Sequence, residues 1–188
     1  MQDTNQCLKS PCSRRKTTLL TSENGKDECQ QQNNHGTWYD AQVAVLARYC
    51  GQPEIARRQI EEHSISRLKK QIDSDGSQPH ELTRTLSKTY CVFNLTGFAV
   101  IARVAAGQGI DLWSGQNASG GSLQLAVNWM LPYLPEEKLW GGQQISLYDP
   151  VFSVPLLHLA HCGTGDPEIR ETCEHLAQRP WDKMDFLA

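Results

Sequence analysis

Apolar side chains recur at helical spacing after residue 37. Positions i, i+3, i+4 and i+7 of one helical face are taken by Val43, Leu46, Ala47 and Cys50. This is the pattern of an amphipathic helix. Gly51 follows at the place where a glycine commonly ends a helix. The pattern therefore predicts a helix over residues 38–50.

The rest of the chain continues this helical character. A second helix is expected to begin at Pro53, because proline fits a first helical position, and to end before Asp73. Residues 77–84 are expected to be extended or irregular, because Pro79 disfavours helix at Gln78. Further helices are expected at 85–106, the most apolar stretch and buried from Cys91 to Ala106, and then at 122–134, 150–161 and 166–178.

No segment shows the sustained alternation of a strand. Helices of this length joined by irregular loops predict an all-α array of antiparallel helix pairs. Either a bundle or a curved helical toroid fits the pattern.

The start of the chain has a different composition. Residues 1–32 are rich in Lys, Arg, Ser, Thr, Gln and Asn, and Leu19 and Leu20 are their only adjacent aliphatic residues. Such a segment buries too little apolar surface to offset chain entropy. We expect residues 1–32 to be a disordered polar segment and residues 33–188 to form the helical domain.

Total charge and length narrow the function classes. The 188 residues fit one domain, and 18 basic against 21 acidic residues give no bulk charge for nucleic acid or a membrane surface. No apolar run approaches the roughly 20 residues of a bilayer span. The polar start of the chain has no signal-peptide apolar region, so no secretion signal is expected in the chain as written.

Metal and cofactor sites are not expected. The seven cysteines are scattered without the spacing of a disulfide scaffold. A zinc site of Cys7, Cys12, Cys29 and His35 would have spacings that fit no usual finger. His158 and His161 stand at i, i+3, but no carboxylate or thiolate is suitably spaced on the same face, which favours a packing role for both.

Four residues supply groups that suit one reaction. A proton beside a sugar carboxylate is weakly acidic, so its removal requires neutralisation of the carboxylate and stabilisation of the developing enolate. Asn34, His35 and Arg84 are suitable donors. One phenol, Tyr90, can take the proton and then protonate the leaving oxygen when both lie on the same face of the sugar. Taken singly, each of the four is more often a cap, a solvated charge or a core side chain.

The order and flanks of these residues carry a family resemblance. The motifs are Asn33-Asn34-His35-Gly36-Thr37-Trp38-Tyr39-Asp40, the stretch from Asp75 to Thr85, Tyr90 to Leu95, Gly109 to Trp113, and Trp140-Gly141-Gly142-Gln143-Gln144. Together they resemble the alginate lyase superfamily of helical-toroid polysaccharide lyases. They are most similar to the branch that includes glucuronan lyases.

The resemblance implies a lyase that cleaves a uronic-acid polymer by β-elimination and leaves a 4,5-unsaturated sugar. By motif position, Asn34, His35 and Arg84 correspond to the carboxylate-neutralising set and Tyr90 to the acid and base. An acidic polysaccharide is the expected partner, no cofactor is implied, and family members are secreted or periplasmic. Residues that could contact sugar are Trp38, Tyr39, Gln78, Glu81 and Trp113. Core packing is at least as strong an alternative for each of the three aromatic residues, and Gln78 and Glu81 would otherwise order the loop.

Two departures from the family have consequences. Arg84 stands six positions before Tyr90, one fewer than is typical, and six helical steps do not return to the same face. Arg84 is therefore expected to lie off the regular helix. The chain also resembles only the C-terminal half of the longer family domain, as a partial (α/α) toroid. Faces left by the missing N-terminal half would favour self-association or partial disorder.

Two other function classes remain open. One is a helical module that binds acidic polysaccharide or a protein partner without cleaving it. The other is a helical-repeat scaffold with no role in sugar binding. The scaffold is disfavoured because the helices share no repeat signature.

Overall fold

The structure is a computed structural model and describes residues 18–115, 120–135 and 138–178. Within these ranges the chain is helical, and its one isolated bridge pairs Leu86 with Gln144. The α-helices are α3 (Glu23–Gln30), α4 (Asn34–Tyr49), α5 (Pro53–Gln59), α6 (Ile65–Gln71), α7 (Pro79–Leu82), α8 (Ser87–Ala106), α9 (Leu123–Met130), α10 (Val154–Thr164) and α11 (Pro167–Ala177). The prediction of an all-α fold is confirmed.

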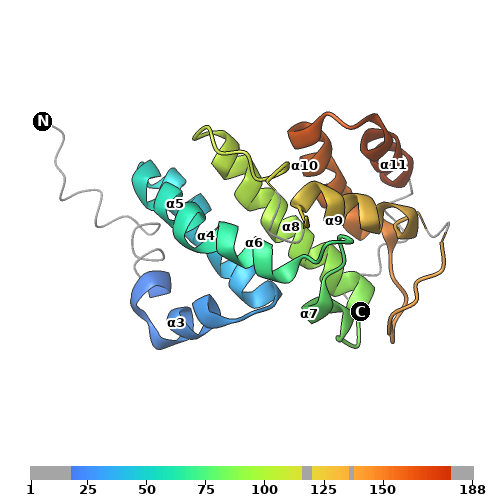
Figure 1. Ribbon diagram of the computed structural model, residues 1–188, viewed down its shortest axis with the longest axis horizontal. Helices are drawn as coiled ribbons and strands as arrows, with labels where there is room; N and C mark the ends of the chain where they lie inside the picture. The colour runs from blue at the N-terminus through green and yellow to red at the C-terminus, as the bar shows by residue number, and fades with distance from the viewer. Residues whose placement is uncertain (1–17, 116–119, 136–137, 179–188) are drawn as a thin grey trace, which may run out of the picture.

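Helix α8 is the centre of the fold. It contacts α4, α7, α9 and α10, and Figure 1 shows it running through the middle of the molecule, with α4 and α5 on one side and α10 and α11 on the other. Leu95, Phe98 and Ile101 have no exposed surface. The predicted burial of this stretch is therefore confirmed.

The apolar composition of α8 is also relevant to whether a helix of this chain could span a membrane. By length and composition alone, α8 is the one helix in the described part of the chain that could cross a membrane. The lengths of the apolar runs in the sequence did not predict such a helix. Its apolar residues pack against neighbouring helices inside the fold, and this burial accounts for its hydropathy.

Close contact between α4 and α8 depends on a glycine. A Cβ atom at Gly97 would lie 3.0 Å from the Cγ2 atom of Thr37 and 3.4 Å from the Trp38 ring. The absent side chain lets the two helices approach at the level of the site motif. This contact sets the distance between the motif residues on α4 and those on α8.

The second predicted helix is continuous but not uniform. Pro53 stands in the first turn of α5, as expected, and a π-helical turn, Ile60–Ser64, joins α5 to α6. The helix ends at Gln71, and the backbone of Ile72 is extended. The later predicted helices are present as well, with 3-10 turns at Leu131–Tyr133 and Pro150–Ser153 at their ends.

The N-terminal segment differs from its expectation. Residues 1–17 lie outside the described residues, but residues 18–32 include α3, whose first turn is capped by Ser22 accepting a hydrogen bond from the Gly25 N–H at 3.1 Å. Helix α3 packs on α4, and Arg67 of α6 donates to the backbone carbonyls of Cys29 and Gln31. Polar tertiary contacts of this kind cannot be read from composition.

Residues 77–84 also differ in part. Gln78 has a non-helical backbone, as the following proline requires, but Pro79 itself begins the short helix α7. Proline is compatible with a first helical turn because its missing N–H would have no intrahelical partner. The expectation of an irregular segment was therefore wrong for Pro79–Leu82 and correct for the residues around it.

Candidate functional site

The start of α4 and the first turn of α8 meet at a pocket of about 300 Å³. Its lining comes from α3, α4, α8 and the residues before α3: Leu19, Glu28, Asn34, His35, Trp38, Tyr39, Gln42, Tyr90 and Phe93. The pocket thus unites Asn34, His35 and Tyr90 with Trp38 and Tyr39. These residues come from motifs about fifty positions apart in the chain.

Asn34 is the most constrained of the group. Asn33 caps α4 by accepting a hydrogen bond from the His35 N–H at 3.2 Å. The buried Glu81 carboxylate accepts the Asn34 backbone N–H at 2.6 Å and its Nδ2–H at 2.8 Å. Both oxygens of one carboxylate therefore hold one asparagine at the end of a helix, where the backbone N–H groups lack intrahelical acceptors.

Burial raises the pKa of Glu81, and the hydrogen bonds from Asn34 and the nearby charges of Arg84 and His80 oppose that rise. Glu81 is 1% exposed and does not line the pocket. It lies behind Asn34 and is not placed for direct contact with a ligand.

His35 projects from the same turn and is half-exposed. Its Nδ1 lies 2.9 Å from Oε2 of Glu28, a residue of α3. None of the described residues bonds its Nε2 atom. As an imidazolium, His35 donates from Nδ1 to Glu28 and keeps an Nε2–H that can donate to a ligand carboxylate.

Tyr90 is paired with Arg84 across the break before α8. The guanidinium carbon of Arg84 lies 4.0 Å from the centre of the Tyr90 ring, within the range of a cation–π contact. Arg84 lies in the turn between α7 and α8, so the expectation that it lies off the regular helix is confirmed. None of the described residues hydrogen-bonds the Tyr90 hydroxyl.

The turn that carries Arg84 is fixed from outside by residues 140–145. The carbonyl of Gln143 accepts the Ser87 backbone N–H at 2.9 Å and the Ser87 hydroxyl at 2.7 Å. Trp140 donates from Nε1 to the Ser87 hydroxyl oxygen at 2.9 Å. Ile145 donates its backbone N–H to the Thr85 carbonyl at 3.0 Å. The motif Trp140 to Gln144 thus caps α8 and orders the approach to Arg84.

The second tyrosine of the pocket differs from Tyr90 in its surroundings. Tyr39 is buried, and its hydroxyl donates to the Leu19 carbonyl at 3.4 Å. Burial, together with Cys29 and Asp40, raises the pKa of Tyr39 to about 12. A phenol held in this way is a poor acceptor of a substrate proton, because its ionised form is disfavoured.

Trp38 packs in the wall of the pocket. Its ring stacks on Phe93 of α8 with centroids 4.8 Å apart, and its Nε1 donates to the Phe93 carbonyl at 3.1 Å. Phe93 is the outer ring of the stack and is 36% exposed. It was missed by sequence reasoning, although it stands one helical turn after Tyr90 on the same face. Glu28 was missed because its segment was expected to be disordered.

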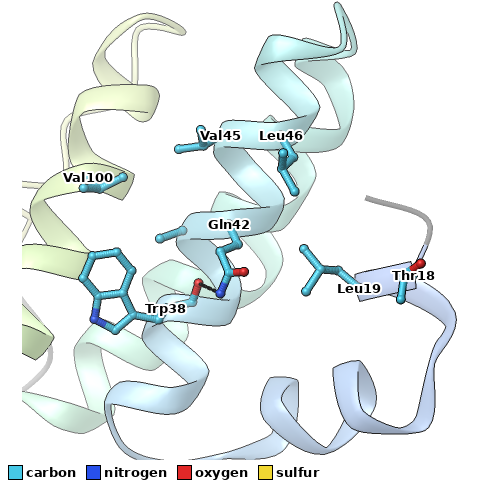
Figure 2. A pocket seen from close by; sticks show the side chains of 8 residues that line it. Thr18, Leu19, Trp38, Gln42, Val45, Leu46 and Val100 are labelled. Atoms are coloured by element: carbon cyan, nitrogen blue, oxygen red, sulfur yellow. Dashed lines mark hydrogen bonds between the residues drawn. The ribbon is translucent and has the colours of Figure 1, made fainter. Parts of the chain in front are cut away.

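An apolar groove continues from the pocket along α4. It has a volume of about 690 Å³ and shares Leu19, Trp38 and Gln42 with the pocket. Figure 2 shows Val45 and Leu46 further along α4, with Trp38, and Val100 of α8, on one side of α4 and Leu19 on the other. The site therefore adjoins a largely apolar surface.

Four expected site residues do not line the pocket: Arg84 and Glu81, which contact Tyr90 and Asn34, and Gln78 and Trp113, which lie away from it. Gln78 is buried and bonds the Cys91 carbonyl and the Asn94 amide at 3.3 and 2.9 Å. Trp113 packs against Gly163, where a Cβ atom would lie 2.0 Å from its Nε1. Trp113 is 7% exposed. Neither Gln78 nor Trp113 is brought together with Asn34 and Tyr90.

A buried ion pair supports the turn before α4. Arg67 donates from Nε to Asp40 at 2.9 Å, and Asp40 is fully buried. The same guanidinium reaches the Cys29 carbonyl at 2.7 Å. Gly36 leaves the space for it, because a Cβ atom there would lie 2.0 Å from Nη1 of Arg67. The requirement for glycine in the site motif thus has a steric cause.

No metal cluster was found in the part of the chain that the structure describes, where no three His, Cys, Asp or Glu side chains form a suitable group. The sequence has two triplets that match the glycosylation pattern, Asn94-Leu95-Thr96 and Asn117-Ala118-Ser119. Asn94 is fully buried. Asn117 of the second triplet lies outside the described residues.

Comparison with known proteins places this fold and site in a family. A family model described as alginate lyase matches residues 13–140. A crystal structure of an alginate lyase from Bacteroides ovatus superposes with a TM-score of 0.81 and 28% sequence identity over 90% of this chain. None of the curated proteins compared matches the chain. The fold is an all-α fold that fits a helical toroid, and the chain belongs to the alginate lyase family.

The structural match covers a larger share of this chain than of the Bacteroides ovatus lyase, so this chain spans about half the length of that protein. It spans 90% of this chain but 45% of the Bacteroides ovatus chain. The matched region includes all four residues of the proposed site, since the family model extends across both motifs.

Proposed function

We propose that the chain carries the site of a polysaccharide lyase that cleaves a uronic-acid polymer by β-elimination. The observation that carries the proposal is the union of Asn34, His35 and Tyr90 in one pocket, with the Arg84 guanidinium on the Tyr90 ring. Membership of the alginate lyase family supports the same reaction class.

The first step is neutralisation of the sugar carboxylate. Asn34 retains one Nδ2–H that no described residue accepts, and His35, as an imidazolium, offers its Nε2–H in the same pocket. Arg84 adds a full positive charge at the Tyr90 side of the pocket. Donors placed around a carboxylate stabilise the negative charge that develops when the neighbouring C5 proton is removed.

Tyr90 then serves first as the base and afterwards as the acid of the elimination. As a phenolate, Tyr90 takes the C5 proton, and the electrons of the C5–H bond form the double bond as the bond between C4 and the glycosidic oxygen breaks. The phenol then gives the same proton to the leaving oxygen. The product carries a double bond between C4 and C5. Tyr39 is not suited to this role because its hydroxyl is held by a carbonyl and its pKa is raised.

We further propose glucuronan, or a mixed uronan rich in glucuronate, as the preferred polymer. The support is the sequence from Arg84 to Ser87, which resembles the glucuronan-type branch. Ser87 has a structural partner in Trp140, so a change in this position would also alter the capping of α8. We also propose a secreted or periplasmic location, by likeness to the family.

The proposal is tested by incubating the chain with glucuronan, alginate and a neutral glucan. Ultraviolet absorbance of a conjugated unsaturated uronide should rise with an acidic polymer and stay flat with the neutral one. Glucuronan should give the highest kcat/KM. Absence of unsaturated product with every uronan, from protein shown to be folded, would overturn the lyase assignment.

A second candidate is a module that binds acidic polysaccharide without cleavage. It is favoured by one observation, the 45% coverage of the Bacteroides ovatus lyase. Its signature would be binding of oligouronates that Arg84→Ala weakens and Tyr90→Phe leaves unchanged, with no product formed. Exposed apolar surface beside the site, including the groove of Figure 2, would then favour self-association, which sedimentation measures.

A further inference from the structure

Residues of α7 and of the turn that follows it contact both sides of the pocket. Glu81 bonds Asn34 on α4, and Arg84, three positions later, stacks on Tyr90 of α8. Glu81 is absent from the pocket lining and is almost completely buried. It therefore affects any ligand only through the residues that it contacts.

We propose that Glu81 is a positioning residue, which fixes the orientation of the Asn34 side-chain amide for the reaction. This inference rests on the proposed lyase function. A carboxylate accepts hydrogen bonds and donates none when ionised. Only the Nδ2 end of the Asn34 amide can therefore face Glu81, and the amide cannot exchange its nitrogen and oxygen ends.

The second contact completes the constraint. Oε1 of Glu81 accepts the Asn34 backbone N–H at 2.6 Å while Oε2 accepts Nδ2–H at 2.8 Å. Main chain and side chain of Asn34 are thus tied to one rigid group. A negative charge is also favourable at the start of a helix such as α4, where the helix dipole is positive.

The orientation matters for charge neutralisation. With one Nδ2–H given to Glu81, the other hydrogen of the same nitrogen remains for a ligand carboxylate. A rotated amide would present a different atom to the carboxylate. Misplacement of a donor in this way lowers transition-state stabilisation more than ground-state binding.

Glu81→Gln is the sharpest substitution, because it keeps size and shape but places an N–H donor opposite Asn34. We expect kcat for uronan cleavage to fall about 10- to 100-fold with KM little changed. Glu62→Gln, an exposed glutamate of the π-helical turn, is the matched control and should leave both constants unchanged. Thermal unfolding establishes that each variant is folded.

A double-mutant cycle with Asn34→Ala separates positioning from general stability. If Glu81 acts through Asn34, Glu81→Gln should have little further effect on kcat/KM in the Asn34→Ala background. Additive losses, or an unchanged kcat in Glu81→Gln alone, would overturn the inference and leave the lyase function in place.

A signal independent of activity distinguishes the two proposals. The Asn34 side-chain amide protons, observed by nitrogen-15 NMR, should shift and exchange faster with water in Glu81→Gln and not in Glu62→Gln. If the wild-type chain cleaves no uronan, the proposed function fails. An unchanged amide signal would then also overturn the role of Glu81.

Discussion

Arg84 and Tyr90 are in contact although only Tyr90 lies on α8. The Arg84 guanidinium carbon stands 4.0 Å from the Tyr90 ring centre because the chain breaks from helix between α7 and α8. A planar cation can stack on the ring face and still direct N–H groups toward a carboxylate. The contact thus links the charge that would bind substrate to the phenol that would react.

Arg84→Lys should weaken substrate binding while preserving the charge. A lysine ammonium is compact and strongly hydrated, so it cannot reproduce both the stack and the fork of donors. We expect KM for a uronan to rise about tenfold, equivalent to about 1.4 kcal/mol. Arg103→Lys, on the exposed surface of α8, is the control. Equal KM values for both variants would contradict a role for the stacked guanidinium.

Gly141 and Gly142 are neighbours in residues 140–145, the segment that caps α8. Replacement of each by alanine should have a different effect on the stability of the chain. A Cβ atom at Gly142 would lie 2.6 Å from the Ser87 hydroxyl oxygen, whereas one at Gly141 meets no atom within 4 Å. We expect Gly142→Ala to lower the free energy of unfolding by about 1–3 kcal/mol and Gly141→Ala to change it by less than about 0.5 kcal/mol. Urea denaturation measures both. Similar values would mean that the loop does not anchor α8.

Removal of Arg67 should destabilise the chain strongly. Arg67→Ala leaves the Asp40 carboxylate buried without its cation and frees the carbonyls of Cys29 and Gln31. The expected loss is about 3–5 kcal/mol in unfolding free energy. Arg170→Ala, which removes an exposed pair with Glu174, should cost less than about 1 kcal/mol. A small effect at Arg67 would show that the turn before α4 is held by other contacts.

Glu81 should give stability a distinctive pH dependence. Burial raises its pKa above the ordinary value of 4.5 in the folded chain. Between the two pKa values the folded chain binds more protons than the unfolded chain, so this contribution is present below about pH 4.5 and is lost as pH rises.

Glu81→Gln does not titrate and isolates this effect. The unfolding free energy of wild type minus that of the variant should fall as pH is raised from about 4.5 toward neutrality. A difference that increases with pH would show that ionised Glu81 is favoured by folding.

Periodicity and turn residues predicted most of the fold. The apolar face of α4, the start of α5 at Pro53 and the burial of α8 follow from local pattern and are present. Helix α3 was not predicted because Arg67, distant in sequence, supplies partners for its backbone. The π-helical turn between α5 and α6 likewise left no mark in the pattern of apolar residues.

The site was predictable to a different extent. Motif order selected Asn34, His35, Arg84 and Tyr90 as candidates, and the non-helical position of Arg84 followed from its spacing to Tyr90. The sequence could not show that Glu81 and Gln78 have different partners, because both are polar residues of one short segment. The fold shows that Glu81 bonds Asn34 and that Gln78 bonds Asn94. Trp113 was included for its ring, but that ring packs against Gly163.

The most direct measurement compares two tyrosines of the same pocket. Initial rates of unsaturated uronide formation are recorded for wild type, Tyr90→Phe and Tyr39→Phe with the best uronan. Loss of acid and base catalysis should lower the Tyr90→Phe rate by at least about 100-fold, while Tyr39→Phe keeps most of the activity. A Tyr90→Phe rate equal to wild type, or loss of activity in Tyr39→Phe alone, would contradict the account.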